Sequence, residues 1–352
     1  MIFTTSICAN YLDKALVLAT SIKEKCKNAT FVLCLLEEQA PTGKELGVFD
    51  KVILAKNLNI PDFYNFIFQY DIVEASTSVK GHLMTHLLES YPKDMCVYVD
   101  PDCQVFSDMV ELLETTTDAP IVLAPHMLEA GNIDMEISSL KHGVFNLGFL
   151  ALRPCEESLK FSRWWADRLY YYSHADFNRG LFTDQKWINL APCFFNVKIL
   201  KHPGYDFATW SFMERKLGKK DNEFTVNGLP LRFVHFSGFD SGNFRWAFEQ
   251  WGDKKNKELG TELEETYKAN LAKFSSLKVK TIPWSYATYK GGIKIEKKTR
   301  TAYSKNFKTM LGFNPFEDKK KVATMLKREA SKKTDIGLGL RITRKLKRMI
   351  KG

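Results

Sequence analysis

Two carboxylates stand two residues apart where a short apolar run ends, in Cys96-Val97-Tyr98-Val99-Asp100-Pro101-Asp102. In an extended segment, side chains i and i+2 lie on the same side, so Asp100 and Asp102 can face one point. An open α/β sheet binds its ligands beyond the carboxyl ends of its strands. Two carboxylates there suit Mg²⁺ or Mn²⁺ held against a diphosphate. The alternative is an ordinary turn after a strand, because Asp and Pro are common turn residues.

A third ligand is predicted late in the chain, in Phe233-Val234-His235-Phe236-Ser237-Gly238. His235 ends an apolar run, and an imidazole with two carboxylates is a reasonable Mn²⁺ set. Gly238 would let the backbone of the following turn approach a phosphate closely. The competing interpretation of such a lone histidine is a core or surface residue with no ligand.

Glycine-rich phosphate loops are absent from the sequence. Neither Gly-X-Gly-X-X-Gly after a strand nor Gly-X-X-X-X-Gly-Lys-Ser/Thr occurs, which disfavours dinucleotide enzymes and P-loop NTPases. A nucleotidyltransferase would normally carry a glycine-rich basic loop near its first strand, whereas Thr5–Asn10 contains no glycine. A nucleotide would therefore be held through a metal and carboxylates.

The composition is that of an ordinary globular protein, with 45% hydrophobic and 26% charged residues. No apolar run approaches the length of a transmembrane helix, and the first residues, Met1–Thr5, do not resemble a signal peptide. The seven cysteines form no Cys-X-X-Cys, which predicts free thiols in a reducing compartment. We therefore expect a cytoplasmic protein.

Charge divides the chain into an expected catalytic domain, 1–289, and a basic helical extension, 290–352. The extension carries 20 Lys and Arg against 5 Asp and Glu, whereas the preceding part carries 31 against 36. An acidic body argues against a nucleic-acid partner. Leu338–Ile350 has the pattern of a basic amphipathic helix, which would place the protein peripherally on an anionic inner membrane face. A solvated charged helix or a disordered tail fits this pattern equally well.

Hydrophobic patterns predict alternating strands and helices, and hence an α/β fold with a mostly parallel central sheet flanked by helices. A long polar stretch that ends at His142 is expected to be a loop, and Thr183 is expected to cap a helix. The predicted strands cover 1–7, 31–36, 51–54, 96–99, 121–124, 145–152, about 197–200 and 231–236, and the predicted helices cover 11–25, 77–90, 159–172 and 183–190.

Five segments, in order over roughly residues 1–245, resemble those of the GT-A fold, Rossmann-like glycosyltransferases, and among them the retaining enzymes of family 8. They are Ala9-Asn10-Tyr11 with Ser21, Tyr98–Asp102, Phe145–Leu150, Thr183–Ile188 and His235–Gly238. The chain departs from the family at Cys8, which replaces an acidic residue, and at Phe239-Asp240-Ser241, which replaces Lys-Pro-Trp. The arginine expected before the metal motif is also missing, and Lys80 is the nearest basic candidate.

The resemblance implies a set of roles. A UDP-sugar would bind at Thr5, Ser6, Asn10, Tyr11, Lys80, Asp100 and Gly238, and Mn²⁺ or Mg²⁺ at Asp100, Asp102 and His235. Gln185, Asp184 and Asn146 would lie near the anomeric carbon as catalytic residues, with Trp187 and Trp210 at the acceptor.

The implied reaction moves a hexose or N-acetylhexosamine from the UDP-sugar to a hydroxyl of a saccharide, lipid-linked or protein acceptor, with retention. The resemblance places it in bacterial surface polysaccharide or glycoprotein biosynthesis. Three alternatives stay open: an inverting transferase with Asp184, Asp206 or Asp240 as general base, a nucleotidyltransferase, and a non-catalytic sugar-binding protein.

Overall fold

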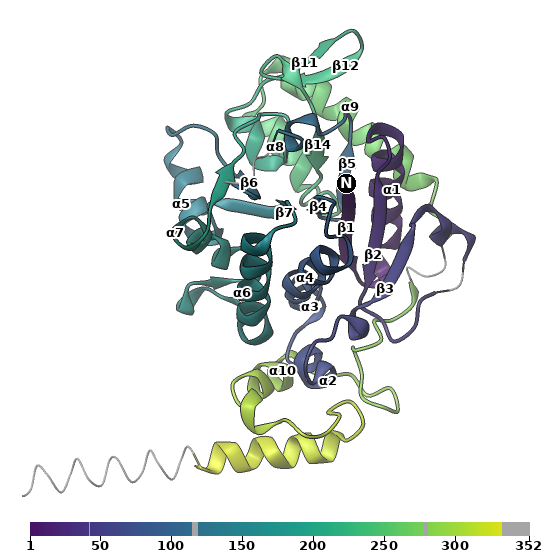
Figure 1. Ribbon diagram of the computed structural model, residues 1–352, viewed down its shortest axis with the longest axis vertical. Helices are drawn as coiled ribbons and strands as arrows, with labels where there is room; N and C mark the ends of the chain where they lie inside the picture. Colours follow the sequence, from purple (N-terminus) through teal and green to yellow (C-terminus); the bar gives the residue numbers. More distant parts are fainter. Residues whose placement is uncertain (42, 115–118, 278–280, 333–352) are drawn as a thin grey trace, which may run out of the picture. The chain divides into compact units, whose positions relative to one another are not determined.

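The computed structural model describes residues 1–41, 43–114, 119–277 and 281–332 (Figure 1). The chain divides into two compact units, one formed by Met1–Asn59 with Val73–Trp284 and the other by Ile60–Ile72 with the residues from Ser285 onward. The division near Trp284 lies close to the expected boundary after residue 289, but the inclusion of Ile60–Ile72 in the second unit was not anticipated. Leu338–Ile350 lies outside the described residues.

The first unit is built on a seven-stranded sheet with the order β10-β6-β7-β4-β1-β2-β3. Only β7 runs antiparallel to its neighbours, β4 and β6, while the other pairs are parallel. The predicted α/β architecture with a mostly parallel sheet is therefore confirmed. In chain order the strands are β1 (Ile2–Ile7), β2 (Thr30–Leu35), β3 (Lys51–Leu54), β4 (Cys96–Val99), β6 (Ile121–Pro125), β7 (Phe145–Leu152) and β10 (Val197–Ile199).

The central strands are continuous apolar runs because helices cover both faces of the sheet. Every residue of β1, β4 and β7 is buried. Alternate residues, such as Phe3 and Val97, pack in one core with Leu16 of α1 (Leu12–Lys25). On the opposite face, Tyr98 lies beneath Lys80 of α4 (Lys80–Ser90). In α4, Gly81 permits a close approach to α6 (Glu156–Tyr172), because an added Cβ would lie 2.5 Å from the backbone nitrogen of Ala166.

Smaller sheets join distant parts of the chain. β5 (Cys103–Val105) pairs antiparallel with β14 (Phe233–His235), and this register sets His235 opposite Cys103. The other pairings are β11 (Leu217–Lys220) with β12 (Glu223–Val226), β12 with β13 (Leu229–Pro230), and β8 (Ala175–Asp176) with β9 (Leu181–Phe182).

The remaining helices differ from the sequence expectation in two places. The polar stretch expected to be a loop contains α5 (Ile133–His142), which Asn132 caps and which buries none of its residues. Thr183 caps no helix, because it has a positive φ and the following helical turn, η6 (Lys186–Leu190), begins after Gln185. Other helices are α2 (Phe63–Phe68), α3 (Ile72–Ser78), α7 (Ala191–Phe194), α8 (Asn243–Trp251), α9 (Lys254–Ala272) and α10 (Lys297–Ser304), and the described residues 319–332 are helical as well.

The second unit has its own aromatic core around two buried polar side chains. The amide of Asn65 donates to the hydroxyl of Tyr303 and to the carbonyl of Met310. Arg300 donates to the carbonyls of Phe68 and Tyr70. These bonds explain why Ile60–Ile72 belongs with the C-terminal part. Across the described residues, no helix has the length and apolar character needed to span a bilayer.

Candidate active site

Asp100, Asp102 and His235 meet at the carboxyl edge of the sheet. His235 Nε2 lies 3.3 Å from Asp102 Oδ1 and 4.0 Å from Asp100 Oδ2. The pairing of β14 with β5 accounts for this, since the backbone N–H of Phe236 donates to the Asp102 carbonyl at 2.8 Å. The three predicted metal ligands are thus brought together from segments more than 130 residues apart.

Asp206 lies on the other side of the His235 ring, with its Oδ1 3.4 Å from Nδ1. The residue is completely buried. It reaches this position because the backbone N–H of His235 donates to the carbonyl of Phe207 at 2.8 Å. A carboxylate on one imidazole nitrogen commonly orients the other nitrogen toward a metal. The sequence suggested Asp206 as a general base, whereas its burial suits it to hold His235.

The donor set fits a divalent cation. Burial favours the neutral form of His235, yet Asp102 and Asp206 hold the pKa of this imidazole well above its ordinary value. The carboxylates therefore favour a positive charge at this point. A proton on His235 supplies one unit of charge, and a divalent ion would supply two.

The thiol of Cys103 also lies near this point, and one donor atom each of Asp102, Cys103 and His235 fall within 4.8 Å of one another. Burial, followed by the charges of Asp102 and Asp100, raises the pKa of Cys103 well above its usual value. Asp100 is not in this group, although its Oδ2 lies 4.0 Å from His235 Nε2. Carboxylate oxygens nevertheless suit Mg²⁺ or Mn²⁺ better than a thiol does, which favours Asp100 over Cys103 as the third ligand for such an ion.

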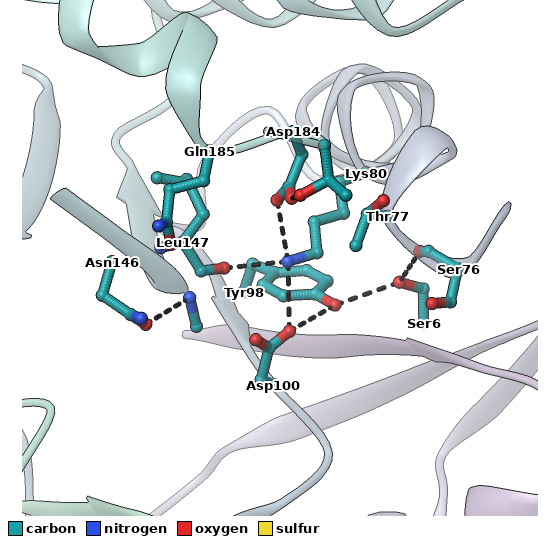
Figure 2. Close-up of polar contacts among 12 residues, drawn as sticks. Ser6, Ser76, Thr77, Lys80, Tyr98, Asp100, Asn146, Leu147, Asp184 and Gln185 are labelled. Carbon is teal, nitrogen blue, oxygen red and sulfur yellow. Dashed lines mark hydrogen bonds and ion pairs between the residues drawn. The ribbon is translucent and has the colours of Figure 1, made fainter. Parts of the chain in front are cut away.

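Lys80 connects the two carboxylate motifs of the sequence (Figure 2). Its ammonium lies 3.1 Å from Asp100 Oδ1 and 2.9 Å from Asp184 Oδ2, and it donates to the carbonyl of Leu147 at 2.9 Å. The ring of Tyr98 lies 4.4 Å below it. Burial alone would lower the pKa of Lys80, but Asp100 and Asp184 raise it well above its usual value. The lysine predicted to bind the donor thus has three partners within the protein.

Ser6 lies next to the Tyr98 hydroxyl that contacts Asp100 (Figure 2). The hydroxyl of Tyr98 donates to Asp100 Oδ1 at 3.0 Å, and Ser6 Oγ lies 3.0 Å from the same hydroxyl. Ser6 Oγ donates its own proton to the carbonyl of Ser76 at 2.8 Å. Thr5, the other residue expected there, is completely buried. Ser6 therefore contacts the tyrosine that donates to Asp100, and its proton is bound within the protein.

Asn146 and Gln185 are fixed beside these charges by backbone contacts. Gln185 Oε1 accepts from the N–H of Leu147 at 3.1 Å, and its amide donates to the carbonyl of His142 at 3.2 Å. Asn146 Oδ1 accepts from the N–H of Gly148 at 2.7 Å. A Cβ on Gly148 would lie 2.5 Å from Asn146 Oδ1 and 2.7 Å from the His235 ring. Glycine is required here because the strand, the amide and the imidazole share this space.

A cavity of about 330 Å³, here called the neutral cavity, opens between these amides and α5. His126, Asn146, Gln185 and Trp210 line it, with His142 and Ser138 of α5 on the outer side. Burial lowers the pKa of His126 to about 4, so the imidazole is uncharged near neutral pH. Of the two tryptophans expected at the acceptor, Trp210 lines this cavity, whereas Trp187 is not among the lining residues and donates its indole N–H to the carbonyl of Tyr172.

A second cavity, of about 430 Å³, lies between the start of α1 and the turn after β14. Asn10 and Tyr11, both predicted to bind the nucleotide, line it with Lys14, Phe239 and Asp240. We call it the Lys14 cavity. Gly238 has a φ of 74°, which a side chain would disfavour, and its carbonyl accepts from the N–H of Asn243 at the start of α8.

Sequence reasoning did not find His126, Lys14 or the role of α5. The Nε2 of His126 lies 3.3 Å from the amide of Asn146, and its ring packs edge-on against Trp210. His126 follows β6 directly, so the rule that ligands bind beyond strand ends could have indicated it. Lys14 gave no comparable signal, because helix periodicity alone does not show which turn faces a cavity.

Comparison with known proteins gives distant likenesses. No family model matches the chain. It is 22% identical over 244 residues to YfnD of Bacillus subtilis (strain 168), an uncharacterised protein. The matched region covers 67% of this chain and 77% of YfnD.

Among the solved structures that the chain resembles are several glycosyltransferases. The galactosyltransferase LgtC, in complex with donor and acceptor sugar analogs, gives a TM-score of 0.47 at 15% identity over 79% of this chain and 97% of that one. Mouse xyloside xylosyltransferase 1 gives a TM-score of 0.40 at 16% identity, over 67% of this chain and 97% of that one. GlyE of Streptococcus pneumoniae TIGR4 gives a TM-score of 0.42 at 14% identity, over 82% of this chain and 66% of that one.

Proposed function

We propose that the chain is a metal-dependent glycosyltransferase of the GT-A type, similar to family 8, that transfers a hexose or N-acetylhexosamine from a UDP-sugar to a hydroxyl of a glycan or glycoconjugate. The observation that carries the proposal is the convergence of Asp100, Asp102 and His235 beside the fixed amides of Asn146 and Gln185. Carboxylates and an imidazole suit a divalent ion that holds a diphosphate, and neutral amides suit sugar hydroxyls.

Asp100, Asp102 and His235 would hold Mn²⁺ or Mg²⁺, which when bound neutralises the charge that develops on the leaving diphosphate. Asp206 keeps His235 oriented, and Lys80 holds Asp100 and Asp184 in place. Trp210 offers an aromatic wall to the apolar face of a sugar. Gln185 still has one N–H and one lone pair free for a hydroxyl after its two backbone bonds.

Retention is favoured because the three candidate carboxylate bases lie away from the neutral cavity or are already paired. Among the described residues that line the neutral cavity, none is Asp or Glu. Asp184 is paired with Lys80, Asp206 is buried behind His235, and Asp240 lines the separate Lys14 cavity. An inverting reaction that used one of them would need its carboxylate at the acceptor hydroxyl. We place the reaction in bacterial surface-glycan or glycoprotein synthesis.

The experiment is a screen of UDP-hexoses and UDP-N-acetylhexosamines with the full chain and Mn²⁺, with UDP release measured and the product anomer assigned by NMR. We expect slow hydrolysis of at least one donor, an α-configured product from an α-linked donor, and a fall on the order of 100-fold in Asp102→Ala. The exposed carboxylate variant Asp167→Ala is the matched control and should keep full activity. A β-configured product would favour the inverting alternative, and an untouched panel would favour a non-catalytic protein.

A further inference from the structure

Lys14, on α1, is a nearly buried cation whose ion-pair partner is a surface carboxylate. The Lys14 side chain is 8% exposed, and its ammonium lies 2.5 Å from Asp240 Oδ2, whereas the Asp240 side chain is 66% exposed. The ammonium also lies 4.3 Å from the centre of the Tyr11 ring. A lysine is rarely buried to this extent unless it is paired. Here the paired anion is mostly hydrated and belongs to a turn remote in sequence.

The surroundings of Lys14 offer room for a phosphate. Lys14 lines the cavity of about 430 Å³ together with Asn10, Tyr11, Asp13 and Asp240. Its partner Asp240 lies five residues after the proposed metal ligand His235, in the turn that follows β14. A ligand held by a metal at His235 could therefore extend toward the Lys14 ammonium.

The cations around the proposed donor site differ in their availability. The ammonium of Lys80 is shared by Asp100, Asp184 and the carbonyl of Leu147. Among the described residues that line the Lys14 cavity, the other cation is Lys268. It is 43% exposed and lies 3.0 Å from both Glu264 and Glu265. Lys80 is 3% exposed and Lys14 is 8% exposed, but of the two only Lys14 is paired with a carboxylate that is mostly hydrated.

We propose that Lys14 binds a phosphate of the nucleoside diphosphate. Without nucleotide, Asp240 pairs with the Lys14 ammonium, and the phosphate displaces this carboxylate on binding. The inference rests on the proposed function and adds a binding residue and a competing anion to it. A diphosphate offers several charged oxygens to a lysine that now holds one carboxylate. Asp240 lies in a turn bounded by Gly238 and Gly242, both at positive φ. Its side chain is already 66% exposed, so releasing the carboxylate from Lys14 into water should cost little free energy.

Two substitutions with opposite expected effects separate this role from a structural salt bridge. Lys14→Met removes the cation and should weaken nucleotide binding by about tenfold or more. Asp240→Asn removes the competitor and should strengthen binding severalfold. If the salt bridge only anchors the turn to α1, both variants should instead bind the nucleotide more weakly than wild type or equally well. Lys14→Arg keeps the charge and should restore part of the affinity.

The measurement is calorimetric titration of the full chain with UDP, GDP and ADP as probes, each with Mn²⁺. Lys23→Met and Asp50→Asn remove another ion pair formed by α1, remote from the site in the chain, and should leave the affinity unchanged. Equal affinity in wild type and Lys14→Met, or no gain in Asp240→Asn, would overturn the inference while the proposed function stands. If Lys14→Met fails to fold by circular dichroism, the result for Asp240→Asn decides. If wild type binds none of the three probes, the proposed function fails as well.

Discussion

On one side of Gly148 lie four carboxylates, of Asp100, Asp102, Asp184 and Asp206, which are paired with only two basic side chains, Lys80 and His235. We call this group the charged centre. On the other side lies the neutral cavity, with the amides of Asn146 and Gln185, an uncharged imidazole and an indole. The charged centre is held by buried strand ends and α4, whereas the outer wall of the cavity is α5, which buries none of its residues.

This difference fits the two halves of the proposed donor. A diphosphate and its metal need charges that are fixed before the ligand arrives, because reorganising buried charges is costly. A sugar needs hydrogen-bonding groups and an aromatic surface, which tolerate a wall that can adjust. The contrast also predicts that substitutions in the charged centre alter stability and chemistry together, whereas substitutions on the outside of α5 alter neither strongly.

The largest effect on stability is expected for Lys80→Met. It leaves Asp184 and Asp100 without their shared cation in a buried position, which should lower the free energy of unfolding by about 3–5 kcal/mol. Guanidinium denaturation at neutral pH measures this. Lys160→Met, on the exposed face of α6, removes a surface ion pair and should leave the denaturation midpoint unchanged. An equally small change in Lys80→Met would mean that the charged centre is not a coupled unit.

Gly148→Ala tests the junction between the two regions. The new methyl group would lie 2.5 Å from Asn146 Oδ1 and 2.7 Å from the His235 ring, so the amide or the imidazole must move. A shift of this kind should reduce UDP-sugar hydrolysis on the order of 100-fold. Gly47→Ala, where an added Cβ meets nothing within 4 Å, should be fully active. Wild-type activity in Gly148→Ala would show that the spacing at this junction is not needed.

The smallest effect is expected on the outer face of α5. Leu140 is 69% exposed, so Leu140→Ser should change the free energy of unfolding by no more than about 0.5 kcal/mol. Leu150→Ala in β7, where the side chain is completely buried, should cost about 2–5 kcal/mol in the same denaturation experiment. A large loss of stability in Leu140→Ser would indicate that the outer wall of the cavity is as firmly packed as the sheet.

The same contrast explains which parts could be predicted from the sequence. The sheet and the proximity of the proposed ligands Asp100, Asp102 and His235 follow from apolar runs that end in polar residues at strand ends. The helix α5 was missed because its apolar residues Ile133, Ile137 and Leu140 face outward among many polar ones. The pairings of Lys80 with Asp184 and of Lys14 with Asp240 depend on how distant elements pack, and no local pattern encodes them.

The most direct test of the central claim is calorimetric titration of Mn²⁺ into the full chain in the presence of UDP, for wild type and for Asp102→Ala. Asp102 contributes a carboxylate 3.3 Å from His235 Nε2, so its loss should remove one ligand of three. The account predicts saturable binding of one ion per chain in wild type and an affinity lower by on the order of 100-fold in the variant. No Mn²⁺ binding by wild type, or equal affinity in Asp102→Ala, would contradict it.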